Sequence, residues 1–355
     1  MIVLARGGTS HEGVTAGDTS CMGRDSILQL LGARTVRLAP MASFTNAAFR
    51  RIAVQCGSGF VTNEEIDAEA LVHRNRIALE MARVEPSDGP VAMQLLGNSA
   101  ASLVPAALHL AEAGAAAVDI NMGCPTPKIV RHGKGAALMR DVATTASILS
   151  ALRAALGDLP LTIKIRGGWD ESQPNAVEVA RMAEDVGVDA ITVHPRTRAQ
   201  RFGGRAPHQV IGDVVRAVRI PVTGNGDITS LAEARQMMAE TGCASVMVGR
   251  AALGRPWLFD EAYERMDAEA RSGYEARVVG EHFDLIEALC SPRQAVMQMK
   301  KHLALYVSGR QHPRGWRAEL FALATPTDVR AAYDRLRAAP LAASEERRDA
   351  ELLPA

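Results

Sequence analysis

The sequence lacks the long apolar run of a membrane-spanning segment, since no stretch approaches the roughly 18–20 uncharged residues that are required. Its start, MIVLARGGTSHEGVTAG, has too short an apolar run for a secretory signal. Net charge is also lacking, because 40 Lys and Arg residues balance 40 Asp and Glu residues. Neutrality argues against binding polyanions over the whole surface but leaves local patches open. We expect a cytoplasmic protein without membrane contact.

Cysteine is scarce, and the five cysteines include no C-x-x-C pair. A disulfide framework or a structural zinc site is therefore not expected, and no metal site is predicted. With 47% hydrophobic and 23% charged residues, the composition is that of a folded chain and excludes disorder for most of it. A length of 355 residues leaves room for a large domain and a small one.

From Val36 onward, short β-type runs alternate with Ala-rich helical segments such as 100–113 and 144–156. Near-uniformly apolar strands that alternate with helices are typical of a parallel sheet buried on both faces. The eight expected strands are Val36–Pro40, Gly59–Asn63, Val91–Leu95, Ala117–Asn121, Leu161–Ile165, Ala190–His194, Pro221–Asn225 and Ser245–Gly249.

Eight such units fit a (β/α)8 TIM barrel, which we predict over residues 35–260. A doubly wound sheet also alternates, but it usually has fewer strands and a phosphate loop after the first one. Here PMASFTNAAF follows the first strand, without G-x-G-x-x-G. Residues 1–34 are expected to form a loosely ordered extension. A small C-terminal all-helical domain is expected over 261–340, with helices at 263–270, 278–290, 292–306 and 326–338, before a polar tail at 341–355.

The active site of a TIM barrel lies at the carboxyl ends of its strands. Glycine-rich turns at Gly224–Asp227 and Gly249–Arg250 follow the last two strands, where such barrels hold a phosphate group on backbone N–H groups. Arg250 would add a charge-assisted contact. The alternative interpretation is that the glycines only serve the turns.

Two cations, Lys164 and Arg166, share one side of an otherwise apolar strand, which is costly unless an anionic ligand meets them. The alternative is that both reach solvent at the barrel rim. His194 is equally consistent with a structural histidine. Cys124 lies in Asn121-Met-Gly-Cys-Pro, on a loop where a thiol is accessible and can act as a general acid. An apolar filler is the alternative for this cysteine.

Together these motifs resemble those of the tRNA-dihydrouridine synthase family, most closely its bacterial B-type branch. They cover the barrel in the family's order, and KKHLALY (300–306) resembles its helical-domain motif. The barrel motifs are APMASFTNAAFRR (39–51), QLLG (94–97), DINMGCPTPKIV (119–130), TIKIRGGWD (162–170), ITVHPRTRAQRFGG (191–204), VTGNGDI (222–228) and VMVGRAALGRPWLF (246–259).

The resemblance implies an FMN enzyme that reduces the C5–C6 double bond of uridine in tRNA, with NADPH as the reductant. Flavin N5 would deliver hydride to C6, and Cys124 would protonate C5 as the general acid. The isoalloxazine ring would be bordered by Pro40, Met41, Ala42, Gln94 and Lys164. The ribityl phosphate would be held by Asn225, Gly226, Asp227, Gly249 and Arg250. The base and cofactor would be oriented by Asn121, Arg166 and His194.

A base inside folded tRNA must be flipped out to be reached, which demands contacts to the RNA backbone. The segment Arg293–Arg337 holds nine basic and three acidic residues, and Arg196, Arg198, Arg201 and Arg205 form a basic loop at the barrel mouth. Such charge runs are often only solvated faces, but beside the motifs they favour phosphate contact. A monomer is expected.

Other classes of protein remain open at this stage. Another FMN barrel, of the dihydroorotate dehydrogenase-like or enoate reductase type, shares the flavin site but needs no basic helical domain. A non-catalytic tRNA-binding protein, or a flavin-free phosphate-binding barrel, would be colourless after purification.

Overall fold

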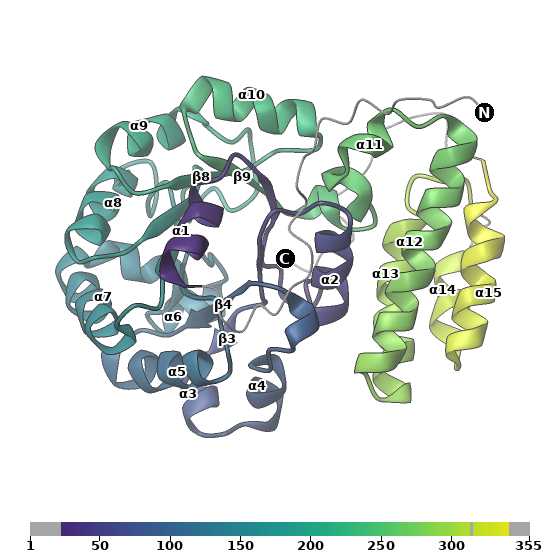
Figure 1. The fold of residues 1–355 in the computed structure, drawn as a ribbon, viewed down its shortest axis with the longest axis horizontal. Coiled ribbons are helices and arrows are strands. Elements are labelled where there is room, and N and C mark those ends of the chain that lie inside the picture. The colour runs from purple at the N-terminus through teal and green to yellow at the C-terminus, as the bar shows by residue number, and fades with distance from the viewer. Residues whose placement is uncertain (1–22, 313–314, 341–355) are drawn as a thin grey trace, which may run out of the picture.

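The computed structural model describes residues 23–312 and 315–340, which form a barrel and a neighbouring group of helices (Figure 1). The strand order is β2-β1-β9-β8-β7-β6-β5-β4-β3, and β2 also pairs with β4, so that the sheet closes on itself. All strand pairs are parallel. The predicted TIM barrel is confirmed.

The barrel strands lie at the expected places, and the second one is divided into two short pieces. They are β1 (Val36–Leu38), β2 (Val61–Thr62), β3 (Ile66–Asp67), β4 (Val91–Leu96), β5 (Ala117–Met122), β6 (Leu161–Arg166), β7 (Ala190–His194), β8 (Val222–Asn225) and β9 (Ser245–Val248). Between β2 and β3, the side-chain oxygen of Asn63 accepts the backbone N–H of Gln94 at 2.5 Å. A side chain thus takes a donor that a regular ladder would pair with a backbone carbonyl.

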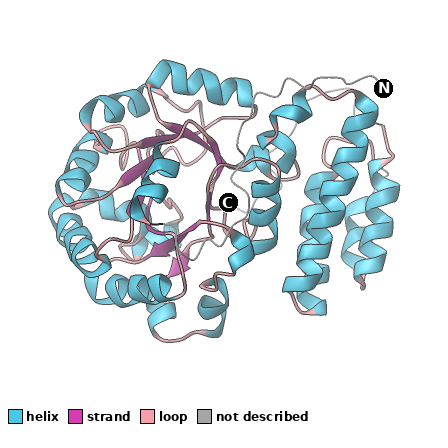
Figure 2. Cartoon of the chain, in the orientation of Figure 1, coloured by secondary structure: helices cyan, strands magenta, loops and turns pink. Residues whose placement is uncertain are grey.

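Helices cover the outside of the barrel, as the cyan ring around the magenta strands in Figure 2 shows. Several begin at a side chain that caps the first turn, such as Asn46, Ser99 and Ser230. The outer helices are α2 (Ala47–Gln55), α3 (Ala68–Val72), α4 (Arg76–Met81), α5 (Ala100–Glu112), α6 (Pro127–Arg131), α7 (Val142–Leu156), α8 (Ala176–Asp185), α9 (Gln209–Ala217) and α10 (Leu231–Thr241). Short 3-10 turns lie at η2 (Pro86–Asp88), η3 (Gly135–Arg140), η4 (Arg250–Ala252) and η5 (Pro256–Phe259).

Helix α1 (Arg24–Gly32) lies across the amino-terminal end of the barrel, in front of its opening in Figure 1. Its Ile27 and Leu31 are buried among residues at the starts of the strands, several of them alanines that leave room for the helix. The buried Arg37 of β1 donates to the carbonyls of Leu30 and Leu31 at the helix end. The expectation of a loose extension is therefore wrong for residues 24–32, because the barrel floor supplies a partner that the short segment does not reveal. Residues 1–22 lie outside the described residues.

The C-terminal helices are α11 (Glu261–Glu264), α12 (Ala268–Leu289), α13 (Pro292–Tyr306), α14 (Trp316–Ala322) and α15 (Pro326–Arg337). The sequence predicts separate helices at 263–270 and 278–290, and the break between them is placed wrongly. Helix α12 runs unbroken from Ala268 through Gly273 to Leu289. A glycine inside a helix costs only about 1 kcal/mol, which packing of the buried Val279 and Phe283 outweighs. Helix α14 was not predicted. The tail at 341–355 lies outside the described residues.

The helical group packs against the barrel through α2. Ile52 of α2 and Trp257 of η5 belong to one buried cluster with Phe283 and Met299 of the helical group. Gly254 has φ of 73°, and a Cβ there would lie 2.4 Å from the carbonyl oxygen of Leu305 in α13. The close approach of these two backbones requires glycine. Among the described residues, no helix combines the length and apolar character that crossing a membrane requires.

Candidate active site

A chain of hydrogen-bonded polar side chains crosses β4, β5 and β6, from Thr162 near the start of β6 to Asn121 near the carboxyl end of β5. Thr162 donates to one oxygen of the Asp119 carboxyl group at 2.5 Å, and Gln94 donates to the other at 2.7 Å. The amide of Asn121 then donates to the side-chain oxygen of Gln94 at 3.0 Å. Burial raises the pKa of Asp119 above its usual value, and these hydrogen bonds offset only part of the rise. The chain of contacts fixes the orientation of two predicted site residues, Gln94 and Asn121.

Asn121 also holds the loop that carries Cys124. Its side-chain oxygen accepts the backbone N–H groups of Gly123 at 3.0 Å and of Cys124 at 2.9 Å. From the other side, Arg166 donates from Nε to the carbonyl of Gly123 at 2.7 Å. The structure therefore brings together three of the predicted residues, Asn121, Cys124 and Arg166, around one turn.

The Cys124 thiol is partly buried, with its Sγ 3.4 Å from the hydroxyl of Thr126 and 3.9 Å from a carboxyl oxygen of Glu65. Burial and the nearby Glu65 carboxylate raise the pKa of the Cys124 thiol above its ordinary value. The thiol is thus protonated at neutral pH, which is the state that a general acid requires.

Two acidic residues of this site, Glu65 and Asp119, escaped the sequence analysis. Glu65 lies in the break between β2 and β3 and accepts a hydrogen bond from the Asn121 amide at 2.6 Å. A signal existed for each one. Asp119 is a charge inside an apolar strand, and Asn63-Glu64-Glu65 is a polar triplet that interrupts one.

Positive charge without an acidic partner gathers at the ends of β6 and β9. Among the ion pairs of the described residues, none includes Lys164, Arg166 or Arg250. Lys164 donates to the side-chain oxygen of Asn225 at 3.3 Å, and burial together with Arg166 lowers its pKa to about 8. Burial lowers the pKa of Arg166 to about 10. A cluster of this kind suits an anionic ligand.

His194 lies beside these cations and is uncharged at neutral pH. Burial, followed by the charges of Lys164, Arg166, Arg196 and Arg250, lowers its pKa well below the usual value. The ring Nδ1 accepts the backbone N–H of Arg196 at 3.3 Å, so the proton of the neutral ring is on Nε2. His194 therefore offers a neutral N–H donor.

The turn after β8 has a special backbone, with φ of 131° at Gly226 and 55° at Asp227. Both oxygens of Asp227 accept hydrogen bonds from Arg196 at 2.8 Å, and one also accepts the N–H of Ala206. The expectation that Arg196 contacts RNA phosphates with the basic loop at the barrel mouth is wrong, because its side chain is used by this pair and the residue is only 2% exposed. On the neighbouring turn, a Cβ at Gly249 would lie 3.6 Å from Sδ of Met41. The end of β9 and the loop after β1 are thus adjacent.

The basic residues of the helical group divide into paired and unpaired ones. Arg330, Arg335 and Arg337 form ion pairs with acidic residues of the same group. Arg293 and Arg317 are exposed and take part in no ion pair of the described residues, whereas Arg314 lies outside them. Arg201 and Arg205 are exposed at the barrel mouth. Part of the predicted basic surface is thus neutralised, and part remains.

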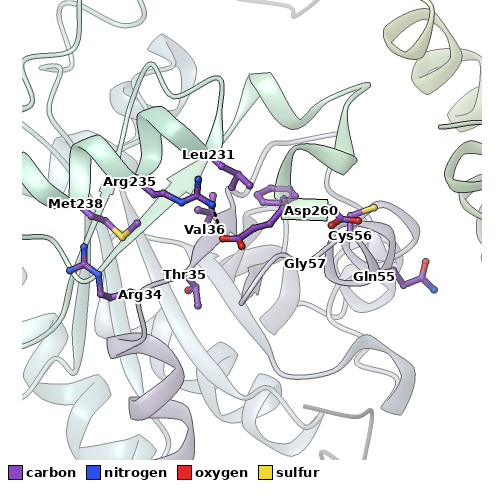
Figure 3. Close-up of a pocket in the computed structure, with 12 residues that line it drawn as sticks. Arg34, Thr35, Val36, Gln55, Cys56, Gly57, Leu231, Arg235, Met238 and Asp260 are labelled. Carbon is purple, nitrogen blue, oxygen red and sulfur yellow. Dashed lines mark hydrogen bonds and ion pairs between the residues drawn. The ribbon is translucent and has the colours of Figure 1, made fainter. Parts of the chain in front are cut away.

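A separate cavity of about 600 Å³ lies by the amino-terminal end of β1, far along the strands from these residues (Figure 3). Three of its charged groups are already engaged, since Arg235 pairs with Glu261 at 2.7 Å and Asp260 accepts from Tyr274 at 2.7 Å. None of the predicted site residues lines this cavity. The barrel mouth remains the candidate active site.

Comparison with known proteins gives the chain its family. The model of the dihydrouridine synthase family matches residues 37–343. The tRNA-dihydrouridine synthase B of Pseudomonas putida is 38% identical over 293 residues, which cover 81% of this chain and 86% of that protein. A probable tRNA-dihydrouridine synthase of Rhodobacter capsulatus is 37% identical over 314 residues, or 86% of this chain and 96% of that one.

Among solved structures, a 2-naphthoyl-CoA reductase complex superposes with a TM-score of 0.52 at 12% identity, over 65% of this chain and 50% of the other. That likeness shows the barrel fold alone. The family match and the two sequence relatives together cover the barrel and the helical group, and they show that the chain belongs to the dihydrouridine synthase family.

Proposed function

We propose that this protein reduces the C5–C6 double bond of a uridine in tRNA, with FMN as its cofactor, NADPH as the reductant and Cys124 as the proton donor. The observation that carries the proposal is the loop of Cys124, which Asn121 and Arg166 hold by hydrogen bonds. Beside it lie Lys164 and Arg166, neither of which forms an ion pair among the described residues. The family membership and the names of the relatives support the same reaction. Action on tRNA also favours a cytoplasmic enzyme.

The residues of the barrel mouth fit an anionic flavin. Lys164 and Arg250 supply positive charge and form no ion pair among the described residues, and the glycines of the turns after β8 and β9 allow a phosphate close to the backbone. The cofactor would be held by Pro40, Met41, Ala42, Gln94, Lys164, Asn225, Gly226, Asp227, Gly249 and Arg250. When bound and reduced, the flavin supplies a hydride to C6 of the uracil.

The chain's own groups account for the proton and for the geometry. Cys124 donates its proton to C5, so that its S–H bond breaks as the C5–H bond forms. Asn121 and Arg166 keep the thiol in place, because both bind the backbone of its loop. His194 offers a neutral N–H donor for a carbonyl oxygen of the base or cofactor.

The exposed arginines support a nucleic-acid substrate. Arg293 and Arg317 on the helical group, and Arg201 and Arg205 at the barrel mouth, are available for RNA phosphates. Contacts of this kind would offset the energy of flipping the uridine out of the folded tRNA. We propose that the protein works as a monomer that binds tRNA between the barrel mouth and the helical group.

The test is a reaction of the purified, flavin-bound protein with NADPH and a tRNA that lacks dihydrouridine. We expect dihydrouridine in the digested tRNA, measured by mass spectrometry, and none with Cys124→Ala although that variant keeps its flavin. Reduction of free pyrimidines without tRNA would instead favour a dihydroorotate dehydrogenase-like enzyme. Binding of tRNA by a colourless protein would favour the non-catalytic alternative.

A further inference from the structure

Glu65 is placed against the reacting thiol by the break in the second barrel strand. Because β2 ends at Thr62 and β3 begins at Ile66, the residues between them leave the ladder. One oxygen of the Glu65 carboxyl group lies 3.9 Å from Sγ of Cys124, and the other accepts the Asn121 amide at 2.6 Å. Both neighbours present donors, which is the pattern that an ionised carboxylate accepts.

The charges around Cys124 make this contact consequential. On one side lie two cations. The charge of Arg166 lowers the pKa of the Cys124 thiol and so favours the thiolate, and the charge of Lys164 lowers the pKa of Glu65. A cysteine beside uncompensated cations ordinarily ionises near neutral pH and becomes a nucleophile. A thiolate has no proton to give, so the cations that suit an anionic cofactor work against a thiol acid at the same place. On the other side lies Glu65. Burial raises the pKa of its carboxyl group above the usual value, the hydrogen bond from Cys124 and the charge of Lys164 lower it, and the neighbouring Asp67, itself paired with Lys134, raises it.

We propose that Glu65 is a positioning residue for the reaction, whose carboxylate keeps the Cys124 thiol protonated against the neighbouring cations and accepts its S–H hydrogen bond. The predicted effect of Glu65 on the tRNA reaction rests on the proposed function, whereas its effect on the thiol does not. Among the described ion pairs, Glu65 forms none, so its charge is left to act on the thiol. Burial and the Glu65 charge both raise the pKa of Cys124, in keeping with this role.

The experiment measures the alkylation of Cys124 by iodoacetamide as a function of pH in the purified, flavin-bound protein. Mass spectrometry of the Cys124 peptide separates it from the other cysteines, and the rate reports the thiolate fraction. With Glu65→Gln, we expect the rate at neutral pH to rise about tenfold, which corresponds to a shift of about one pH unit. Glu65→Asp, which keeps the charge on a shorter side chain, should give an intermediate rate.

Glu69→Gln is the matched control, since Glu69 carries the same charge on the neighbouring helix α3 and pairs with Lys134 rather than with the thiol. It should reproduce the unchanged protein. Two outcomes overturn the proposal: a pH profile of alkylation in Glu65→Gln that equals that of the wild-type protein, or a shift in Glu69→Gln as large as the shift in Glu65→Gln. If Glu65→Gln fails to fold, Glu65→Ala, which also removes the charge, takes its place, and an unshifted alkylation profile in Glu65→Ala overturns the proposal.

A second measurement tells the role of Glu65 from a merely structural one. In the tRNA reaction, the loss of activity at alkaline pH should begin at lower pH in Glu65→Gln, with flavin content unchanged and with partial rescue by Glu65→Asp. A uniform loss at every pH would contradict the proposal. The alkylation experiment needs neither tRNA nor turnover. If the wild-type protein formed no dihydrouridine in tRNA, the proposed function would be refuted and the alkylation result would still hold.

Discussion

Lys301, in helix α13 of the helical group, donates a hydrogen bond from Nζ to the carbonyl oxygen of Ser43, in the loop that follows β1. The same Nζ lies 4.9 Å from the centre of the Phe44 ring. Ser43 has φ of 69°, a left-handed conformation that is unfavourable for a residue other than glycine. A helix outside the barrel therefore holds a strained turn beside Met41 and Ala42, which are proposed to border the flavin.

Replacement of Lys301 by methionine removes the donor and keeps most of the apolar stem. We expect weaker flavin binding, because a turn that loses its hydrogen bond costs about 1–3 kcal/mol to hold in place. Flavin fluorescence during titration measures the affinity. Lys300→Met is the control, since Lys300 donates to Phe321 within the helical group. Equal affinities in the two variants would show that the contact with Ser43 does not support the flavin site.

Lys164 should make flavin binding depend on pH. Its pKa of about 8 is below the ordinary value, so the side chain is charged below that pH and loses its charge above it. Binding of an anion favours the charged form, and the affinity should therefore fall as pH rises through 8, by at most about tenfold per unit. Equilibrium binding of FMN across this range measures it. Lys164→Met should bind more weakly with a flat profile, and a sloping profile in that variant would assign the effect to another group.

The pair between Arg196 and Asp227 should contribute strongly to stability. Asp227→Asn leaves the buried Arg196 without its counter-charge, which we expect to cost about 3–5 kcal/mol of unfolding free energy. Urea unfolding measures the change. The exposed pair of Arg216 and Asp213 is the matched control, and Asp213→Asn should cost no more than about 1 kcal/mol. A similar small cost for both variants would contradict the structural role given to Asp227.

The barrel could be predicted well from the sequence, because each strand is a short apolar run that can be recognised without knowing which segments pack against it. Local patterns failed where the partner of a segment comes from elsewhere in the fold. Helix α1 packs on the alanine-lined barrel floor, and α12, which continues through Gly273, buries Phe283 against α2 of the barrel. No spacing rule reveals either partner.

The candidate site divides in the same way. Residues that belong to continuous motifs, such as Cys124 and Lys164, could be singled out from the sequence as candidates. Glu65 was missed because its relation to Cys124 spans 59 positions and requires the break in the second strand. The sequence groups Arg196 with the other arginines of its loop as a phosphate contact, and only the fold shows that Asp227 binds it.

Arg317 should contribute to tRNA binding without affecting flavin chemistry. Its guanidinium lies over the ring of Trp316, 5.3 Å from the ring centre, and Arg317 has no acidic partner among the described residues. Arg317→Glu replaces a phosphate contact with repulsion, so tRNA affinity should fall about tenfold and the dependence on salt should become less steep. Filter binding over a range of salt concentrations measures both, while oxidation of NADPH by oxygen should be unchanged. Arg216→Glu, on helix α9 at the far side of the barrel from the helical group (Figure 1), removes the same charge and should leave tRNA affinity in place. Equal losses in the two variants would mean that tRNA senses only the net charge of the protein, and that the helical group has no special part in binding it.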